Sequence, residues 1–175
     1  MPCVINASQT SGLVMTSDLS GVLQLQNNGV AVPPLTVAPA FSAYANTNQT
    51  VTSATFTKVQ INTKEFDTNT NYDATTNYRF TPTVAGYYQV NAQLNVTSGN
   101  TRNIVLIYKN GGAFKVGNDV QTNTANGVTV SALIYMNGST DYLEMYGYAT
   151  SGTTVQFLGG AGTTTYFQAF LARSA

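Results

Sequence analysis

The stretch GYYQVNAQLNV, residues 86–96, alternates between apolar and polar side chains along most of its length. Successive side chains of a β-strand point to opposite faces of the sheet, so this alternation predicts a strand that is buried on one face only. The apolar face holds Tyr88, Val90, Ala92, Leu94 and Val96. Gln and Asn occupy the other face, which predicts a polar outer surface without charge. A chain built around such a strand has to bury one sheet face against a second layer.

Similar strand-like segments recur through the rest of the chain at intervals of about 8 to 12 residues. They are separated by turn dipeptides such as Asn110-Gly111, Asn126-Gly127 and Asn137-Gly138. The sequence shows no helical periodicity, and residues 118–126 are expected to form a loop before a strand at Val128. The pattern therefore predicts an all-β chain with an antiparallel sandwich or barrel.

The surface of such a fold has to be polar, yet only 8% of the residues are charged and the formal net charge is zero. The 27 Thr and 18 Asn residues supply polar surface instead. A surface of this kind produces no long-range field that attracts nucleic acid or an anionic membrane, and the sequence contains no basic cluster. It also lacks the run of ~20 apolar residues that a membrane span needs. We expect neither nucleic-acid binding nor membrane insertion.

A separate segment precedes the main β pattern. In SGVLQLQNNGVAVPPL, residues 20–35, Asn28-Gly29 is the favoured dipeptide for a tight hairpin turn. Pro33, Pro34 and Pro39 then favour an extended connector, which places the domain boundary at residue 39. Residues 1–39 are interpreted as an N-terminal arm for attachment to another protein, because an isolated hairpin is only marginally stable. The apolar contacts of the arm are expected to be Leu13, Val14, Leu23, Leu25, Val30 and Val32.

The first residues, MPCVINASQTSG, have neither the basic nor the apolar region of a secretory signal peptide, so cleavage of a signal is not expected. Cys3 is the single cysteine, which excludes a disulfide within one chain. The stability of the protein is therefore expected to come from packing or from assembly.

Some predicted strands are apolar on both faces, unlike residues 86–96. NIVLIYK, VSALIYM, DYLEMYGY and TTYFQAFLA all carry large apolar or aromatic side chains at consecutive positions. A two-layer sandwich buries only one face of each sheet. Two-sided strands such as residues 104–108 and 166–171 therefore indicate that the outer face of one sheet is covered too, most simply by another subunit.

Several short motifs of residues 40–175 follow the order found in one known family. AFSAYAN at residues 40–46 is followed by Phe80, Gly86 and Tyr88, and YFQAFL stands close to the end of the chain. In these motifs the segment resembles the globular head of the q subunit of complement component one, which shares a jelly roll with the tumour necrosis factors (TNF). The resemblance implies an antiparallel jelly-roll β-sandwich of the TNF-like type.

The sequence departs from the pattern of this family in two ways. Ile61 and Val90 stand where the family usually has phenylalanine, and the interval from Tyr72 to Phe80 is one residue longer than usual. The matched positions are interpreted as core residues that specify the fold: Phe41, Phe80, Gly86, Tyr88 and Phe167. Glycine at position 86 is expected to supply a turn conformation that a Cβ would penalise.

The resemblance also implies a compact homotrimer around a threefold axis lined by the inner sheets. This agrees with the two-sided strands, which need a cover on one outer face. The residues expected at the subunit interface are Tyr108, Tyr135, Tyr146, Tyr166 and Phe170.

Residue types that carry catalysis are scarce. Histidine is absent and cysteine occurs once, which excludes Ser-His-acid and Cys-His arrangements and ordinary zinc sites. Glu65, Asp67 and Asp73 gather in one predicted loop, which is interpreted as a solvated acidic loop. The alternative is a calcium site, as in some members of the family. We expect no enzyme activity and no cofactor, with calcium as the one ion left open.

Two functions fit these features. The first is a structural protein of a bacteriophage virion, a trimeric capsid decoration (cement) protein or short head fibre, because charge-poor Thr/Asn/Gly-rich chains with such an arm resemble these proteins. Its arm would bind the major capsid protein or another virion protein, and the protein would be located in the virion after assembly in the host cytoplasm. The alternative is a tail fibre or receptor-binding protein that recognises a host-surface carbohydrate through Tyr44, Tyr72, Tyr142 and Tyr148.

Overall fold

A computed structural model describes the backbone of residues 3–8, 12–17, 25–27, 30–32, 38–97, 99–121, 124, 126–151, 154–160 and 164–175, and the side chains from residue 38 onward except that of Asn126. The chain divides into two compact units, Met1–Ala38 and Pro39–Ala175. The described parts of both units are built from β-strands. They contain no helix that is long and apolar enough to cross a membrane.

The first unit is a four-stranded sheet with the order β2-β1-β3-β4. β1 (Cys3–Ser8) pairs antiparallel with β2 (Gly12–Ser17) and parallel with β3 (Leu25–Asn27), and β3 pairs antiparallel with β4 (Val30–Val32). The pair of β3 and β4 is the hairpin expected from the sequence, although its turn lies outside the described residues. The hairpin is not isolated, because β1 pairs with the other edge of β3.

The residues predicted for attachment are distributed over this sheet. Leu13 and Val14 lie on β2, Leu25 on β3, and Val30 and Val32 on β4, while Leu23 falls outside the described residues. Their role in attachment stays a prediction.

The second unit is a sandwich of two antiparallel sheets, so the expectation of an all-β antiparallel sandwich is confirmed. The six-stranded sheet has the order β13 (Gly112–Val120), β12 (Asn100–Lys109), β15 (Leu143–Ser151), β10 (Arg79–Phe80) and β9 (Tyr72–Asp73), with β7 (Thr57–Lys58) beside β15. The seven-stranded sheet has the order β6 (Gln49–Val51), β16 (Val155–Phe157), β11 (Gly86–Val96), β17 (Tyr166–Ser174), β5 (Ala40–Tyr44) and β8 (Thr63–Asp67), with β14 (Asn126–Met136) on β11.

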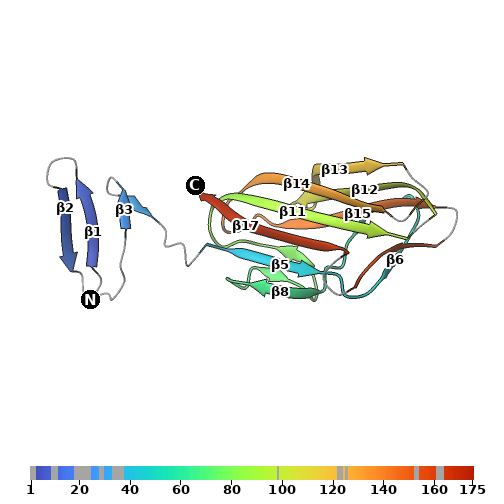
Figure 1. Cartoon of the computed structure of the whole chain (residues 1–175), viewed down its shortest axis with the longest axis horizontal. Helices are drawn as coiled ribbons and strands as arrows, with labels where there is room; N and C mark the ends of the chain where they lie inside the picture. The colour runs from blue at the N-terminus through green and yellow to red at the C-terminus, as the bar shows by residue number, and fades with distance from the viewer. Residues whose placement is uncertain are drawn as a thin grey trace. The chain divides into compact units, whose positions relative to one another are not determined.

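Strand β11 is the centre of the seven-stranded sheet. It pairs along its whole length with β14, and over most of its length with β17. Figure 1 shows β17 running between β11 and β5. The alternation expected for residues 86–96 is present, since Tyr88, Val90, Leu94 and Val96 are fully buried and Ala92 is nearly so. The opposite face of β11 carries the polar residues and Tyr87.

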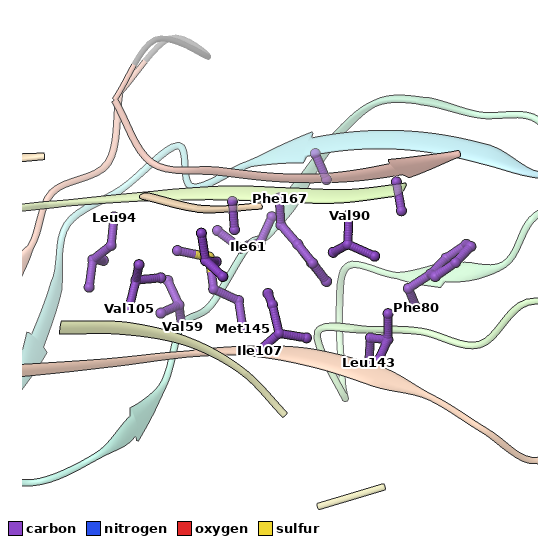
Figure 2. Close-up of a cluster of buried hydrophobic side chains, with 14 of the residues drawn as sticks. Val59, Ile61, Phe80, Val90, Leu94, Val105, Ile107, Leu143, Met145 and Phe167 are labelled. Atoms are coloured by element: carbon purple, nitrogen blue, oxygen red, sulfur yellow. The ribbon is translucent and has the colours of Figure 1, made fainter. Parts of the chain in front are cut away.

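The hydrophobic core fills the space between the two sheets. Val90 and Leu94 of β11 and Phe167 of β17 point toward Ile107 of β12 and Met145 of β15, as Figure 2 shows. One end of the core is aromatic, because the ring of Phe41 stacks on those of Tyr72 and Phe80 at centroid distances of 4.6 Å in both pairs. Burial of these large side chains is the main source of stability in a fold of this kind.

Two local expectations are wrong. Strand β13 continues to Val120, which pairs with Asn103, so residues 118–120 are strand and not loop. Pairing with β12 overrides the low strand propensity of Gly117, Asn118 and Asp119. Gly86 lies inside β11 and has no turn conformation. Glycine is needed there because a Cβ would lie 2.4 Å from the carbonyl oxygen of Arg173 on β17.

The two-sided strands also have a different distribution from the one expected. Residues 104–108 lie on β12 of the six-stranded sheet, and residues 166–171 lie on β17 of the seven-stranded sheet. Their outer faces point away from each other on opposite sides of the sandwich. A cover on the outer face of one sheet therefore cannot account for both strands.

Candidate functional site

The five residues predicted as the fold signature meet in or beside the core. Phe41, Phe80, Tyr88 and Phe167 are at most 1% exposed. The rings of Phe41 and Phe167 pack edge to face, and so do those of Phe80 and Tyr88. The Tyr88 hydroxyl donates to the carbonyl oxygen of Val84 at 2.8 Å, and burial raises the pKa of Tyr88 to about 12. These residues have packing roles and leave no reactive group exposed.

Large apolar side chains gather on the outer face of the seven-stranded sheet, which points away from the core. Tyr87 pairs across the strands with Tyr135, and Gln89 pairs with Leu133 on one side and Phe170 on the other. The next row includes Ser42, whose partner on β8 is Phe66. We call these exposed side chains the apolar patch: Phe66 (52% exposed), Tyr87 (42%), Leu133 (56%), Tyr135 (45%) and Phe170 (49%). Single exposed apolar residues are ordinary, whereas a contiguous group indicates an interaction surface.

The remainder of this face carries an uncharged hydrogen-bond network. Gln89 Nε2 donates to Ser131 Oγ at 2.9 Å, and Ser131 Oγ donates to Asn91 Oδ1 at 2.8 Å. At the β5–β8 edge, Ser42 Oγ donates to Glu65 Oε2 at 2.6 Å. Because these groups satisfy one another, burial of this region costs less than burial of unpaired polar groups. An apolar patch with a satisfied polar surround has the composition of a protein–protein interface.

A lysine connects the apolar patch to the edge strand β13. Lys109 Nζ donates to the carbonyl oxygen of Tyr135 at 2.7 Å and pairs with Asp141 at 2.8 Å. It also lies 5.8 Å from the ring centroids of Phe114 and Tyr135. Hydrogen bonds from Asn110 and Lys109 lower the pKa of Asp141, since they stabilise its charged form. Phe114 of β13 thereby continues the apolar surface beyond the sheet face.

The residues predicted at a subunit interface fall into two groups. Tyr135, Tyr166 and Phe170 lie on the outer face of the seven-stranded sheet, because their neighbours Ile134, Phe167 and Ala169 are buried in the core. Tyr108 and Tyr146 lie on the outer face of the six-stranded sheet. One interface through one sheet face can therefore include the first group only.

Tyr108 and Tyr146 have partners within the chain. Their rings stack on each other at a centroid distance of 3.7 Å and an interplanar angle of 13°. On the same outer face, Ile104 and Leu106 are each only 4% exposed. Leu106 pairs across the strands with Tyr146 on one side and Val116 on the other. The outer face of the six-stranded sheet is thus covered by its own side chains.

The four tyrosines considered for sugar stacking have different surroundings. Tyr72 is 3% exposed and its hydroxyl donates to the carbonyl oxygen of Ile61 at 2.9 Å, so its ring cannot stack on a ligand. The Tyr142 ring lies under the guanidinium of Arg79 at 4.6 Å. The Tyr148 ring packs against Phe56. Tyr44 is half-buried at the end of β5.

The acidic loop uses its carboxylates to fold its own backbone. Asp67 accepts hydrogen bonds from the backbone N–H groups of Asn71 and Tyr72, each at 3.0 Å. Asp73 accepts backbone hydrogen bonds from residues 75, 76 and 77, and these hold the pKa of its carboxyl well below the usual range. Glu65 is bonded to Ser42. Within the part of the chain that the structure describes, no group of three or more carboxylate or cysteine side chains is placed to hold a metal ion.

The sequence interpretation missed most of the apolar patch. Tyr87 occupies an outer position in the same alternation that predicts β11, so an aromatic residue among Gln and Asn was a signal of interface on that face. Leu133 has the same phase as Ser131 and Tyr135 on β14. Phe114 carried no such signal, since β13 could not be recognised as a strand from its sequence.

Comparison with known proteins identifies the fold. No protein-family model matches the sequence, and no curated protein matches it either. Among solved structures, the chain is similar to the TNF protein Eiger from S. frugiperda, with a TM-score of 0.61, 11% identity, and coverage of 79% of this chain and 94% of that one. It is also similar to murine APRIL, with a TM-score of 0.59, 8% identity, and coverage of 77% and 98%. The second unit therefore has a TNF-like jelly-roll fold, as the sequence resemblance implies. At such low identity, the similarity concerns the fold alone.

Proposed function

We propose that this chain is a non-enzymatic structural protein whose TNF-like domain closes into a homotrimer by burying the apolar patch. The observation that carries the proposal is the location of five half-exposed large apolar side chains on one sheet face. Exposure of so much contiguous apolar surface is unfavourable in water, and burial against another copy stabilises the assembly by roughly 25 cal/mol per Å² of apolar area.

The distribution of apolar residues favours a closed ring. Phe114 and Val116, 48% and 64% exposed, lie on the edge strand β13, while the apolar patch lies on a sheet face. Two different surfaces that complement each other make a heterologous contact, and such contacts close into rings when the rotation permits. In our proposal β13 of one copy packs against the seven-stranded sheet of the next, and Tyr166 lies near the axis with the polar network.

We further propose that the trimer belongs to a tailed-bacteriophage virion, as a capsid decoration (cement) protein or short head fibre. Support comes from the low charge of the chain, its Thr- and Asn-rich surface, and the separate N-terminal sheet unit that precedes the TNF-like domain. Residues 1–39 would attach the trimer to the major capsid protein or another virion protein. A protein without internal disulfides would gain its durability outside the cell from the subunit contacts.

The attachment role can be tested with virions and with particles that lack the protein. Cryo-electron microscopy should reveal trimeric density on the capsid lattice, and purified full chain should bind decoration-free particles. Deletion of residues 1–39 should abolish this binding and leave the trimer intact. Density on the tail tip with none on the capsid would contradict the decoration role.

A further inference from the structure

A polar hollow of about 480 Å³ lies on the hairpin formed by β9 and β10, away from the apolar patch. Its lining consists of hydroxyl, amide, carboxylate and guanidinium groups together with part of one aromatic residue: Thr70, Asn71, Tyr72, Asp73, Asn77, Arg79, Thr81 and Thr83. Tyr72 and Phe80 point into the core, so strand alternation directs Asp73 and Arg79 outward. The hollow is therefore built on the outer face of the six-stranded sheet.

Arg79 is a cation without an acidic partner. Its neighbours across the strands are Asp73 and Glu144, yet among the described residues no carboxylate lies within ion-pair distance of its guanidinium. Glu144 pairs instead with Lys58 at 2.5 Å. The carboxylate of Asp73 accepts its hydrogen bonds from the loop that follows it. Two acids thus stand next to Arg79 in register, and both are occupied elsewhere.

The orientation of Arg79 is fixed by an aromatic ring. Its guanidinium carbon lies 4.6 Å from the ring centroid of Tyr142, in a cation–π contact. A stacked guanidinium keeps its N–H groups free at the edge, where they match the two oxygens of a carboxylate. The residue is thus held in a position to bind an oxygen-rich anion.

The loops around the hollow are rigid. Asn77 Nδ2 donates to Asp73 at 2.8 Å, and Lys58 Nζ donates to the carbonyl oxygen of Asn77 at 3.2 Å. Thr70 and Tyr78 have φ angles of 55° and 50°, a left-handed conformation that is costly for residues with a β-carbon. Strain of this kind persists where the surrounding structure holds it, and it occurs often at binding sites. The hydrogen bonds at both ends of the hairpin keep the hollow in one shape.

We propose that this hollow binds an acidic saccharide, with Arg79 holding the carboxylate and the lining hydroxyl and amide groups of Thr81, Thr83 and Asn77 bonding to sugar hydroxyls. A sugar presents many donors and acceptors, and the lining offers both kinds of partner within one shallow site. The lining residues come from a single chain, so the site does not depend on trimer formation. It would give a virion protein a means of contact with a glycan-coated host surface.

Binding can be measured by isothermal titration calorimetry on the full chain. The probes are sialyllactose and trigalacturonate as acidic saccharides, lactose as the neutral counterpart of the former, and sodium phosphate as a bare anion. We expect at least one acidic saccharide to bind and lactose to bind at least tenfold more weakly. Arg79→Gln should weaken acidic-saccharide binding at least tenfold, and Thr81→Val should weaken it severalfold.

Arg173→Gln is the matched control, because Arg173 is exposed on β17 and the substitution removes the same charge. This control should bind the acidic saccharide as the wild type does. Thermal melting of each variant checks that the fold is intact, and Thr81→Val provides a second test should Arg79→Gln fail to fold. The proposal is overturned by phosphate binding without saccharide binding, by equal binding of lactose, or by acidic-saccharide binding that neither Arg79→Gln nor Thr81→Val weakens.

Discussion

The tripeptide Leu-Ile-Tyr occurs twice in this chain, once in each sheet, and the two copies have different surroundings. In β12 and in β14 the isoleucine points into the core, where Ile107 is 0% exposed and Ile134 is 1% exposed. The leucines point outward, but Leu106 is 4% exposed whereas Leu133 is 56% exposed. The same local sequence therefore gives a covered outer face in the six-stranded sheet and an open one in the seven-stranded sheet.

The cause lies in the neighbours that each strand has. β12 lies between β13 and β15, so Leu106 has Val116 and Tyr146 beside it. β14 pairs with β11 only, and the residue opposite Leu133 is Gln89. An outward leucine on a central strand is covered by its own sheet, whereas one on an edge strand needs a partner. The difference teaches that a two-sided strand alone does not reveal a subunit interface.

The largest expected effect is on assembly, through a charge placed on the open face. Tyr135→Asp should convert the trimer to monomer at micromolar concentration, because a buried unpaired carboxylate in the interface is strongly unfavourable. Size-exclusion chromatography with light scattering measures this change. Phe56→Asp is the control, since Phe56 is also 45% exposed but packs against Tyr148 of the six-stranded sheet. A monomeric Phe56→Asp variant would show that the two faces do not differ as described.

A pair of matched truncations tests the two leucines directly. Leu106→Ala should lower the free energy of unfolding by about 2–5 kcal/mol, as for other buried leucines, and leave the trimer assembled. Leu133→Ala should mainly increase the dissociation constant of the trimer. Urea unfolding at several protein concentrations separates these effects. Equal changes in stability at all concentrations would contradict the assignment of Leu133 to an interface.

A smaller effect is expected at the junction between the apolar patch and β13. Asp141 binds Lys109 and Asn110, and loss of these charge-assisted hydrogen bonds in Asp141→Asn should cost about 1–3 kcal/mol at neutral pH. The folded-state pKa of Asp141 is lowered from 3.8, so its stabilisation is present above that value and is lost as the pH falls through the folded-state pKa. Melting curves of both proteins from pH 7 to pH 2 should therefore converge at the acidic end. A constant difference in Tm across this range would contradict the role of the ionised carboxylate.

The sequence predicts the fold of the second unit well because its signals are local. The alternation of residues 86–96 and the order of the motifs around Phe80 and Tyr88 lead to the TNF-like sandwich that the structure has. The expected hairpin of β3 and β4 is likewise present, since its pattern lies within residues 20–35. Such features depend on residues that are close in the chain.

The candidate surfaces depend on contacts between distant residues, which the sequence does not reveal. Tyr108 and Tyr146 are 38 positions apart and stack on each other, which leaves them no need for a partner subunit. Arg79 lacks an acidic partner only because Lys58 engages Glu144. Neither fact follows from periodicity or composition. Strand order, rather than strand pattern, decides which apolar side chains stay exposed.

The central claim is that the open face of the seven-stranded sheet is closed by further copies of the same chain. The most direct test is the mass of the full chain in solution, measured by sedimentation equilibrium over a range of micromolar concentrations. We predict one species with three times the mass of the chain. A stable monomer or a dimer at these concentrations would contradict the threefold closure.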